Sequence, residues 1–152
     1  MVKKENKLIN WMLILSLVAI AISSYLLYLH YSSESSSFCD ISPSLSCDIV
    51  NKSIYSEFPP GSGIPVSLMG IVTFIIIIVA LELIRNNKHK KQLSNFIFYL
   101  MVISALFALY LVYTELFLIL SICILCIFLD LIIIIMLILS YKLRGVINAK
   151  KH

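Results

Sequence analysis

Four long stretches of the chain consist almost entirely of hydrophobic residues. They cover about residues 8–29, 64–83, 96–113 and 116–141. A helix needs roughly 20 mostly apolar residues to cross a membrane; the third stretch comes close to that length and the others reach it. Runs such as Ile75–Ile78 lack the alternation of a β-barrel strand, and a helix satisfies its own backbone groups in lipid. The pattern therefore predicts an all-α membrane protein with a bundle of four transmembrane helices.

The connection between the first two predicted helices, residues 30–63, is the only long one. Ser46 is a suitable N-cap for a helix in its middle, and the pair Pro59 and Pro60 would end that helix. We expect a short helix that lies on the membrane face and covers the open ends of the spanning helices. Four apolar residues spaced three or four apart form its expected buried stripe: Cys47, Val50, Ile54 and Phe58.

The composition agrees with a membrane protein and excludes several other classes. Of the 152 residues, 61% are hydrophobic and only 13% are charged, and the mean hydropathy is +1.01. Soluble domains average roughly 45–50% apolar and about 25% charged residues. An ordinary soluble enzyme, a disordered chain and a nucleic-acid-binding domain are therefore excluded. We treat residues 1–152 as a single membrane domain.

The basic residues are distributed in a way that predicts topology. Eleven of the 12 Lys and Arg residues lie in the two terminal tails and in the second connection, which a four-helix chain places on one side. The connection 30–63 holds only Lys52, together with four acidic residues. The positive-inside rule then predicts cytoplasmic termini and an outward-facing first connection. We also expect the membrane to be a prokaryotic cytoplasmic membrane. The eleven are Lys3, Lys4, Lys7, Arg85, Lys88, Lys90, Lys91, Lys142, Arg144, Lys150 and Lys151.

The four cysteines form two pairs that predict redox chemistry. Cys39 and Cys47 lie in the outward loop, where an oxidising compartment allows a disulfide. Cys123 and Cys126 lie three apart in the fourth predicted helix, a spacing that a disulfide accepts. Cys123 is expected seven residues inside that helix, about 10 Å below the outer surface. A dithiol at such a depth would react with a lipid-soluble quinone, because both half-reactions involve two electrons and two protons.

Other interpretations of the cysteines remain open at this point. Cys39 and Cys47 would form a structural staple in a non-catalytic four-helix scaffold. Cys123 and Cys126 would then be small buried hydrophobic residues. Four thiolates would also suit a tetrahedral zinc ion, although no histidine supports such a site and we expect no metal.

The arrangement of these residues resembles the vitamin K epoxide reductase family, in its single-domain, four-helix form. The resemblance covers nearly the whole chain and implies a four-helix bundle around a quinone, capped by the cysteine-bearing loop. It is carried by Phe38-Cys39-Asp40, Ser46-Cys47, Ser53, Cys123-Ile124-Leu125-Cys126, Gly63-Ile64-Pro65 and Gly70.

The resemblance implies a role for each cysteine. Cys126 matches the cysteine beside the quinone ring, and Cys123 matches its partner, which exchanges with the loop pair. Cys39 and Cys47 match the shuttle pair that exchanges with an external thiol protein. Which loop cysteine reacts with Cys123 stays open. Ser53 matches a family serine near the active site.

The candidate quinone-binding residues are Ser53, Ser67, Met69, Leu111 and Asp130. Asp130 shares a helix face with Cys123 and Cys126, and a carboxyl group deep in a bilayer suggests function. It would be a hydrogen-bond partner or proton donor for a quinone oxygen, or else a carboxyl satisfied by a hydroxyl of Ser104 or Ser67. The chain departs from animal members by having Val66 or Ser67 in place of an asparagine, and Asp130 in place of a tyrosine.

These observations predict a quinone-dependent thiol:disulfide oxidoreductase. Electrons would pass from a soluble thioredoxin-fold thiol oxidase outside the membrane to Cys39–Cys47, then to Cys123–Cys126, and then to a quinone such as menaquinone or ubiquinone. The result would be disulfide formation in exported proteins. One alternative is an enzyme whose primary role is to reduce a quinone or vitamin K epoxide. The other is the non-catalytic scaffold with a structural loop disulfide.

Overall fold

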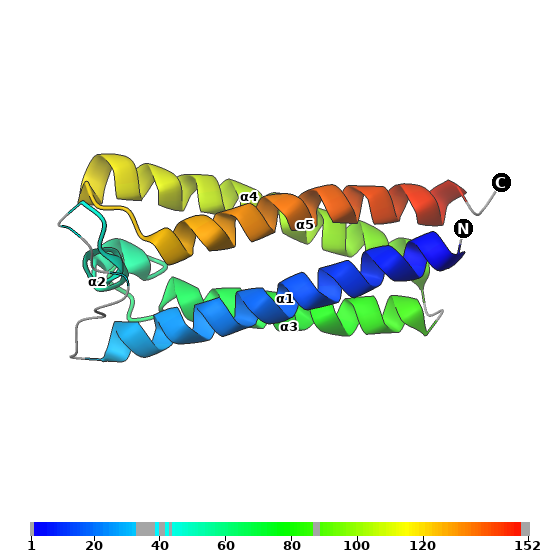
Figure 1. Ribbon diagram of the computed structural model, residues 1–152, viewed down its shortest axis with the longest axis horizontal. Coiled ribbons are helices and arrows are strands. Elements are labelled where there is room, and N and C mark those ends of the chain that lie inside the picture. Colours follow the sequence, from blue (N-terminus) through cyan, green and yellow to red (C-terminus); the bar gives the residue numbers. More distant parts are fainter. Residues whose placement is uncertain (1, 33–38, 40–41, 43, 87–88, 150–152) are drawn as a thin grey trace.

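Four long helices lie side by side and form an elongated bundle (Figure 1). The computed structural model describes residues 2–32, 39, 42, 44–86 and 89–149. The long helices are α1 (Val2–Tyr31), α3 (Val66–Arg85), α4 (Lys90–Tyr113) and α5 (Ile124–Ala149). Each is long and apolar enough to cross a membrane, and the described residues form no extended strand. The predicted fold class, a helical membrane bundle with a short helix in the first connection, is confirmed.

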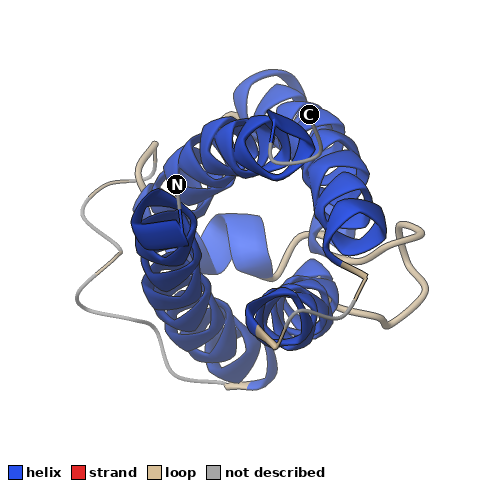
Figure 2. Cartoon of the chain, turned by 90° about the vertical axis from the view of Figure 1, so that its right-hand side faces the viewer, coloured by secondary structure: helices blue, strands red, loops and turns tan. Residues whose placement is uncertain are grey.

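A short helix, α2 (Cys47–Asn51), closes one end of the bundle, and both termini lie at the other end (Figure 1). In a view along the bundle, α2 lies between the four long helices at the far end (Figure 2). Below it, α1 and α3 pack closely where Gly70 of α3 meets Ser23 of α1. A Cβ atom at Gly70 would lie only 3.2 Å from the Ser23 hydroxyl oxygen. The core beneath α2 is apolar, with side chains such as Met12, Ile77 and Met136 fully buried.

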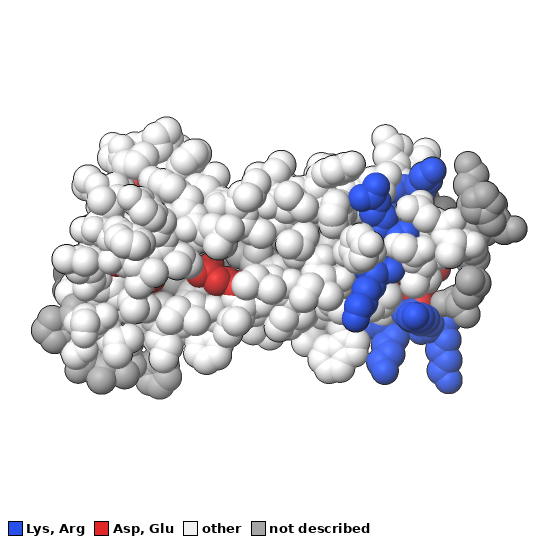
Figure 3. Space-filling view, turned by 90° about the horizontal axis from the view of Figure 1, so that it is seen from above, with Lys and Arg blue, Asp and Glu red and all other residues white. Residues whose placement is uncertain are grey.

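The outside of the bundle is apolar along its length, and its basic residues gather at one end. Many large hydrophobic side chains are exposed on α1, α3, α4 and α5, as expected for helices that face lipid. Lys and Arg side chains form a group at the end that holds the termini (Figure 3). At that end, buried Glu5 of α1 pairs with Lys90 of α4. The protein is thus a multi-pass membrane protein, and the side of the membrane on which each end lies stays a prediction.

Only the first half of the buried stripe predicted for the connection 30–63 is found in the structure. Ser46 is the N-cap of α2, since its side chain accepts a hydrogen bond from the Ile49 N–H at 3.2 Å. The chain then turns at Ser53 into the 3₁₀-helix η1 (Ile54–Ser56), which changes direction and interrupts the helical period. Cys47 and Val50 are buried as expected, but Ile54 and Phe58 are exposed, so these two predictions are wrong. Phe58 instead packs edge-on against Phe107 of α4.

The start of the last helix also differs from the prediction, which placed it at about Leu116. The helix α4 continues into a π-helical segment, η2 (Thr114–Ile119). Leu120 then adopts a left-handed conformation with φ 57°, and α5 begins at Ile124. The predicted boundary is wrong because Leu116–Leu120 is apolar throughout, and hydrophobicity reports contact with lipid rather than the point at which a helix ends.

Candidate redox site

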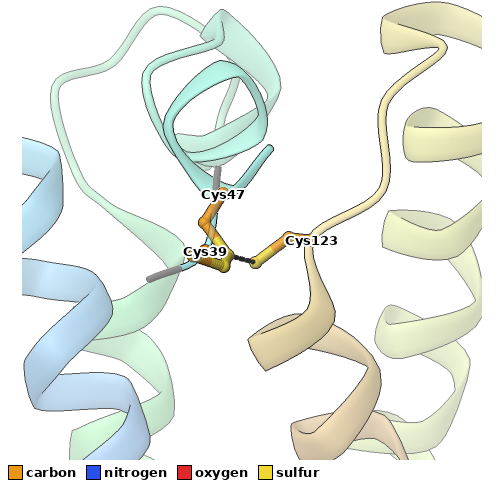
Figure 4. A group of neighbouring side chains, drawn as sticks. All are labelled: Cys39, Cys47 and Cys123. Carbon is orange, nitrogen blue, oxygen red and sulfur yellow. Dashed lines mark hydrogen bonds between the residues drawn. A yellow bond between two sulfur atoms is a disulfide. The ribbon is translucent and has the colours of Figure 1, made fainter. Parts of the chain in front are cut away.

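Three of the four cysteine sulfurs meet under the cap formed by α2. Cys39 and Cys47 are joined in a disulfide, with 5.5 Å between their Cα atoms, whereas Cys123 and Cys126 are free thiols. The Sγ atom of Cys123 lies 3.0 Å from Sγ of Cys47 (Figure 4). All three residues are at most 2% exposed. The free thiol of the second pair is therefore in contact with the disulfide of the first, and Cys47 is the loop cysteine that it meets.

Cys123 lies immediately before α5 rather than two turns inside a helix, which corrects its predicted position. Its Sγ atom accepts a hydrogen bond from the N–H of Cys126, in the first turn of α5, at 3.4 Å. The pKa of the Cys123 thiol is lowered, chiefly because the Cys126 side chain hydrogen-bonds to its sulfur, and this effect exceeds the opposing effect of burial. A cysteine at the start of a helix with a lowered pKa is the usual nucleophile of a Cys-x-x-Cys motif.

The cap is held over Cys123 by hydrogen bonds to elements on both sides. Asn51, the last residue of α2, donates from Nδ2 to the carbonyl oxygen of Leu26 in α1 at 2.6 Å. His30 of α1 donates from Nδ1 to the carbonyl oxygen of Asn51 at 2.7 Å. On the other side, the Ile122 N–H donates to the Ser44 carbonyl oxygen at 3.0 Å. These bonds attach the loop both to α1 and to the segment that leads into Cys123.

A cavity of about 480 Å³ lies among the helices below the cap, and Cys126 forms part of its wall. Its lining is mostly apolar, and its volume is within the range of roughly 300–1,000 Å³ that is usual for small-molecule sites. Four of the five predicted quinone-binding residues line it: Ser67, Met69, Leu111 and Asp130. Ser53 is not among the lining residues, because its hydroxyl donates to the Val50 carbonyl oxygen at 2.7 Å within the cap.

The polar groups of the cavity suit a ligand with carbonyl oxygens in an otherwise apolar body. The Ser67 hydroxyl oxygen is buried and has no hydrogen-bond partner in the described part of the chain. Ser104 donates to the Leu100 carbonyl oxygen, and no hydrogen bond between the described residues joins Asp130 to Ser104 or Ser67. Buried polar groups in proteins are nearly always paired, so an unpaired hydroxyl on an apolar cavity indicates a ligand that accepts a hydrogen bond. These residues fit a quinone.

Comparison with known protein families agrees with this geometry. The family model for vitamin K epoxide reductases matches residues 10–141, which is most of the chain. The chain belongs to the vitamin K epoxide reductase family. Comparison with curated proteins gave no match. Membership of the family indicates a membrane redox enzyme and confirms the resemblance inferred from the cysteine motifs.

Glu115 is a residue of the redox site that was not predicted from the sequence. It lies in η2, is only 6% exposed and lines the same cavity as Cys126. Its Oε2 atom accepts a hydrogen bond from the N–H of Cys123 at 3.2 Å. The sequence offered one signal, an acidic residue eight positions before Cys123 in an apolar stretch. The predicted helix bounds, 96–113 and 116–141, left Glu115 between two helices and concealed that signal.

A zinc site made of the four cysteine thiolates was one of the open alternatives. The sulfurs of Cys39, Cys47 and Cys123 all lie within 4.8 Å of one another, close enough to share an ion. Zinc binds thiolates, however, and two of these sulfurs are joined in the disulfide. The arrangement of a disulfide in contact with a free thiol suits thiol:disulfide exchange.

Proposed function

We propose that this membrane protein is a thiol:disulfide oxidoreductase that transfers electrons from an external thiol protein to a membrane quinone. The observation that supports it most directly is the 3.0 Å contact between Sγ of Cys123 and Sγ of Cys47, which connects the two cysteine pairs. The external partner is a soluble thioredoxin-fold thiol oxidase, and the outcome is disulfide formation in exported proteins. The cysteine loop faces outward, and both termini are cytoplasmic.

The two pairs exchange through a mixed disulfide. After the partner has reduced Cys39–Cys47, the Cys47 thiolate attacks Cys123 of the Cys123–Cys126 disulfide, and Cys126 leaves as a thiolate. The Cys39 thiolate then attacks Cys47, and Cys123 leaves. The products are a Cys39–Cys47 disulfide and two free thiols at Cys123 and Cys126, which is the pairing in the structure. Two electrons have then moved from the loop pair to the membrane pair.

The cavity is the proposed quinone site. A bound quinone, such as menaquinone or ubiquinone, accepts two electrons and two protons. Cys126 would face the ring, and Met69 and Leu111 would provide apolar contacts. The Ser67 hydroxyl would donate a hydrogen bond to a carbonyl oxygen, and Asp130 would hold a proton or a hydrogen bond at the same cavity.

Replacement of Cys126 by Ala tests the electron relay. We expect the Cys126→Ala variant to lose thiol-dependent quinone reduction, because the two-electron step needs both sulfurs of the pair. The measurement is the fall in quinone absorbance with purified protein and a membrane-permeable dithiol. Ile127→Ala is the matched control, since Ile127 is the exposed neighbour and does not line the cavity. Near-normal turnover by Cys126→Ala would contradict the relay and favour the non-catalytic scaffold.

Replacement of Cys39 by Ala tests the shuttle role of the loop pair. The Cys39→Ala variant should not oxidise a thioredoxin-fold protein, because Cys47 then has no second loop cysteine with which to form the shuttle disulfide. It should retain some turnover with the permeable dithiol, which reaches Cys123–Cys126 directly. Quinone reduction with each reductant distinguishes the two cases, and equal loss with both would make the loop disulfide structural.

A further inference from the structure

The Glu115 carboxyl group lies between the membrane cysteine pair and the cavity. It accepts the hydrogen bond from the Cys123 N–H, and it also interacts with the side chain of Cys126. It is buried, and it lines the cavity together with Cys126 and Asp130. The exchange chemistry described above uses the sulfurs alone and gives this carboxyl group no task.

Among the described lining residues, no basic side chain is available to pair with a negative charge in this cavity. The titratable side chains on its wall are Tyr55 of η1, Glu115 of η2, and Cys126 and Asp130 of α5, while no described lining residue is Lys, Arg or His. An unpaired ion in an apolar site costs a large desolvation free energy, and such a group is usually neutral. A thiolate formed at Cys126 therefore needs a proton from a neighbouring group.

The two sulfurs of the pair have different neighbours. Sγ of Cys123 accepts a hydrogen bond from a backbone N–H at the start of α5, which stabilises a thiolate. Sγ of Cys126 accepts no backbone hydrogen bond from the described residues, and its side chain interacts with the side chains of Cys123 and Glu115. Cys126 is also the sulfur that leaves when Cys47 attacks Cys123.

We propose that Glu115 is the general acid that protonates Cys126 as Cys126 leaves Cys123. This inference rests on the proposed exchange between the cysteine pairs. In the step, the Cys47–Cys123 bond forms, the Cys123–Cys126 bond breaks, and the Glu115 proton moves to Cys126, leaving a carboxylate that still accepts the hydrogen bond from the Cys123 N–H. A carboxyl group is a stronger acid than a thiol, with reference pKa values of about 4.3 and 8.5, so the transfer is favourable. Glu115 regains a proton from those that the Cys47 and Cys39 thiols release as their disulfide forms, so the Cys126 thiol keeps its proton for the quinone.

The test isolates this step from both quinone and partner. In a Cys39→Ala background, Cys47 attacks the Cys123–Cys126 disulfide, and the reaction stops at the Cys47–Cys123 disulfide with a free Cys126 thiol. A jump from acidic to neutral pH starts the reaction in purified, quinone-free protein. Rapid alkylation followed by peptide mass spectrometry measures the appearance of the Cys126 thiol. Glu115→Gln is the test variant, since its amide oxygen still accepts the Cys123 N–H but the side chain has no acidic proton.

We expect Glu115→Gln to slow the release of Cys126 by about 100-fold to 10,000-fold, the usual contribution of a general acid. Glu82→Gln, the same substitution on a half-exposed residue near the opposite end of the bundle, should leave the rate unchanged. A Glu115→Gln rate close to that of the background would overturn the proposal and leave Glu115 with a positioning role. Failure of Cys47 to capture Cys123 while Glu115 is intact would instead overturn the exchange itself.

A second measurement covers the case in which Glu115→Gln does not fold. Infrared difference spectra are recorded during the same reaction in Cys39→Ala protein and in Cys39→Ala protein that also carries Asp130→Asn. Loss of a protonated carboxyl band in both proteins supports Glu115, because the other carboxyl of the cavity is absent from the second. No change of a carboxyl band, or a change that disappears with Asp130→Asn, would overturn the proposal.

Discussion

The side chain of Asn51 attaches the cap to α1 by a hydrogen bond, and its removal should make the cap open more often over Cys123. Asn51 is 7% exposed, and its Nδ2 atom donates to the Leu26 carbonyl oxygen at 2.6 Å. An Asn51→Leu substitution keeps a side chain of similar bulk but removes the donor. Since Asn51 ends the same short helix that Cys47 begins, weaker attachment of α2 should uncover Cys123 more often.

The size of the effect follows from the environment of this hydrogen bond. The Leu26 carbonyl lies inside α1 and keeps its bond to the N–H four residues later, so the substitution leaves no orphaned acceptor. The loss is then the net value of a neutral hydrogen bond, about 0.5–1.5 kcal/mol. With about 1.4 kcal/mol for each factor of ten, the open fraction of the cap should rise about twofold to twelvefold.

Labelling of Cys123 measures this opening. Cys123 is 0% exposed, so a charged, water-soluble maleimide reaches it only when the cap opens. If the cap closes again faster than the maleimide reacts, the labelling rate follows the open population. Peptide mass spectrometry of protein with its Cys39–Cys47 disulfide intact separates labelling at Cys123 from labelling at Cys126.

Lys52→Ala is the matched control, because Lys52 is the exposed neighbour of Asn51 and its i,i+4 pair with Asp48 contributes little. Labelling of Cys123 in Asn51→Leu at the wild-type rate would refute the role of Asn51 in holding the cap. An equal rise in Lys52→Ala would show that any change at the end of α2 opens the loop.

Two further predictions concern the membrane topology and Asp130. Reporters attached at the C-terminus and inserted near Lys90 should both be cytoplasmic, and one inserted near Ser35 should be external. The reason is that basic residues gather at the end of the bundle that holds the termini. An external C-terminus would contradict the outward cysteine loop. Asp130→Asn should slow quinone reduction about 100-fold to 10,000-fold if Asp130 supplies a proton, and less if it only hydrogen-bonds, while exchange between the cysteine pairs stays close to wild type. Wild-type quinone turnover would show that Asp130 is only a buried carboxyl.

The helical architecture could be predicted from sequence because lipid imposes a simple condition on the chain. A segment that crosses the membrane must be apolar for about 20 residues and must pair its own backbone groups, so each span is visible in the hydropathy. The two cysteine pairs could also be recognised from the sequence, but their positions alone left a structural disulfide and a zinc site open until the family motifs were considered. Val50 and Cys47 were recognised as buried because they belong to a single short helix.

The details of the cap could not be predicted in the same way. Ile54 and Phe58 continue the spacing of the helical stripe, but the chain turns at Ser53, whose hydroxyl and N–H both bond to the Val50 carbonyl oxygen. Such local side-chain bonds compete with helix continuation, and periodicity alone does not reveal which of the two is favoured. Ser53 was assigned to the quinone site for its motif, whereas its hydroxyl has this structural partner.

The break at Leu120 is the feature that determines the chemistry of the site, and hydropathy could not show it. Inside a helix, the N–H of Cys123 would bond to the carbonyl four residues earlier and would be closed to side chains. At the start of α5 the first N–H groups are free of helical partners. The Cys123 N–H therefore bonds to Glu115, and the Cys126 N–H bonds to the Cys123 sulfur. The same break turns the segment 121–123 toward the loop, where Ile122 bonds to Ser44 and Cys123 meets Cys47. A single change of backbone direction thus gives the Cys123 sulfur its amide donor, brings it to Cys47 and places a carboxyl group beside Cys126, the sulfur that leaves it.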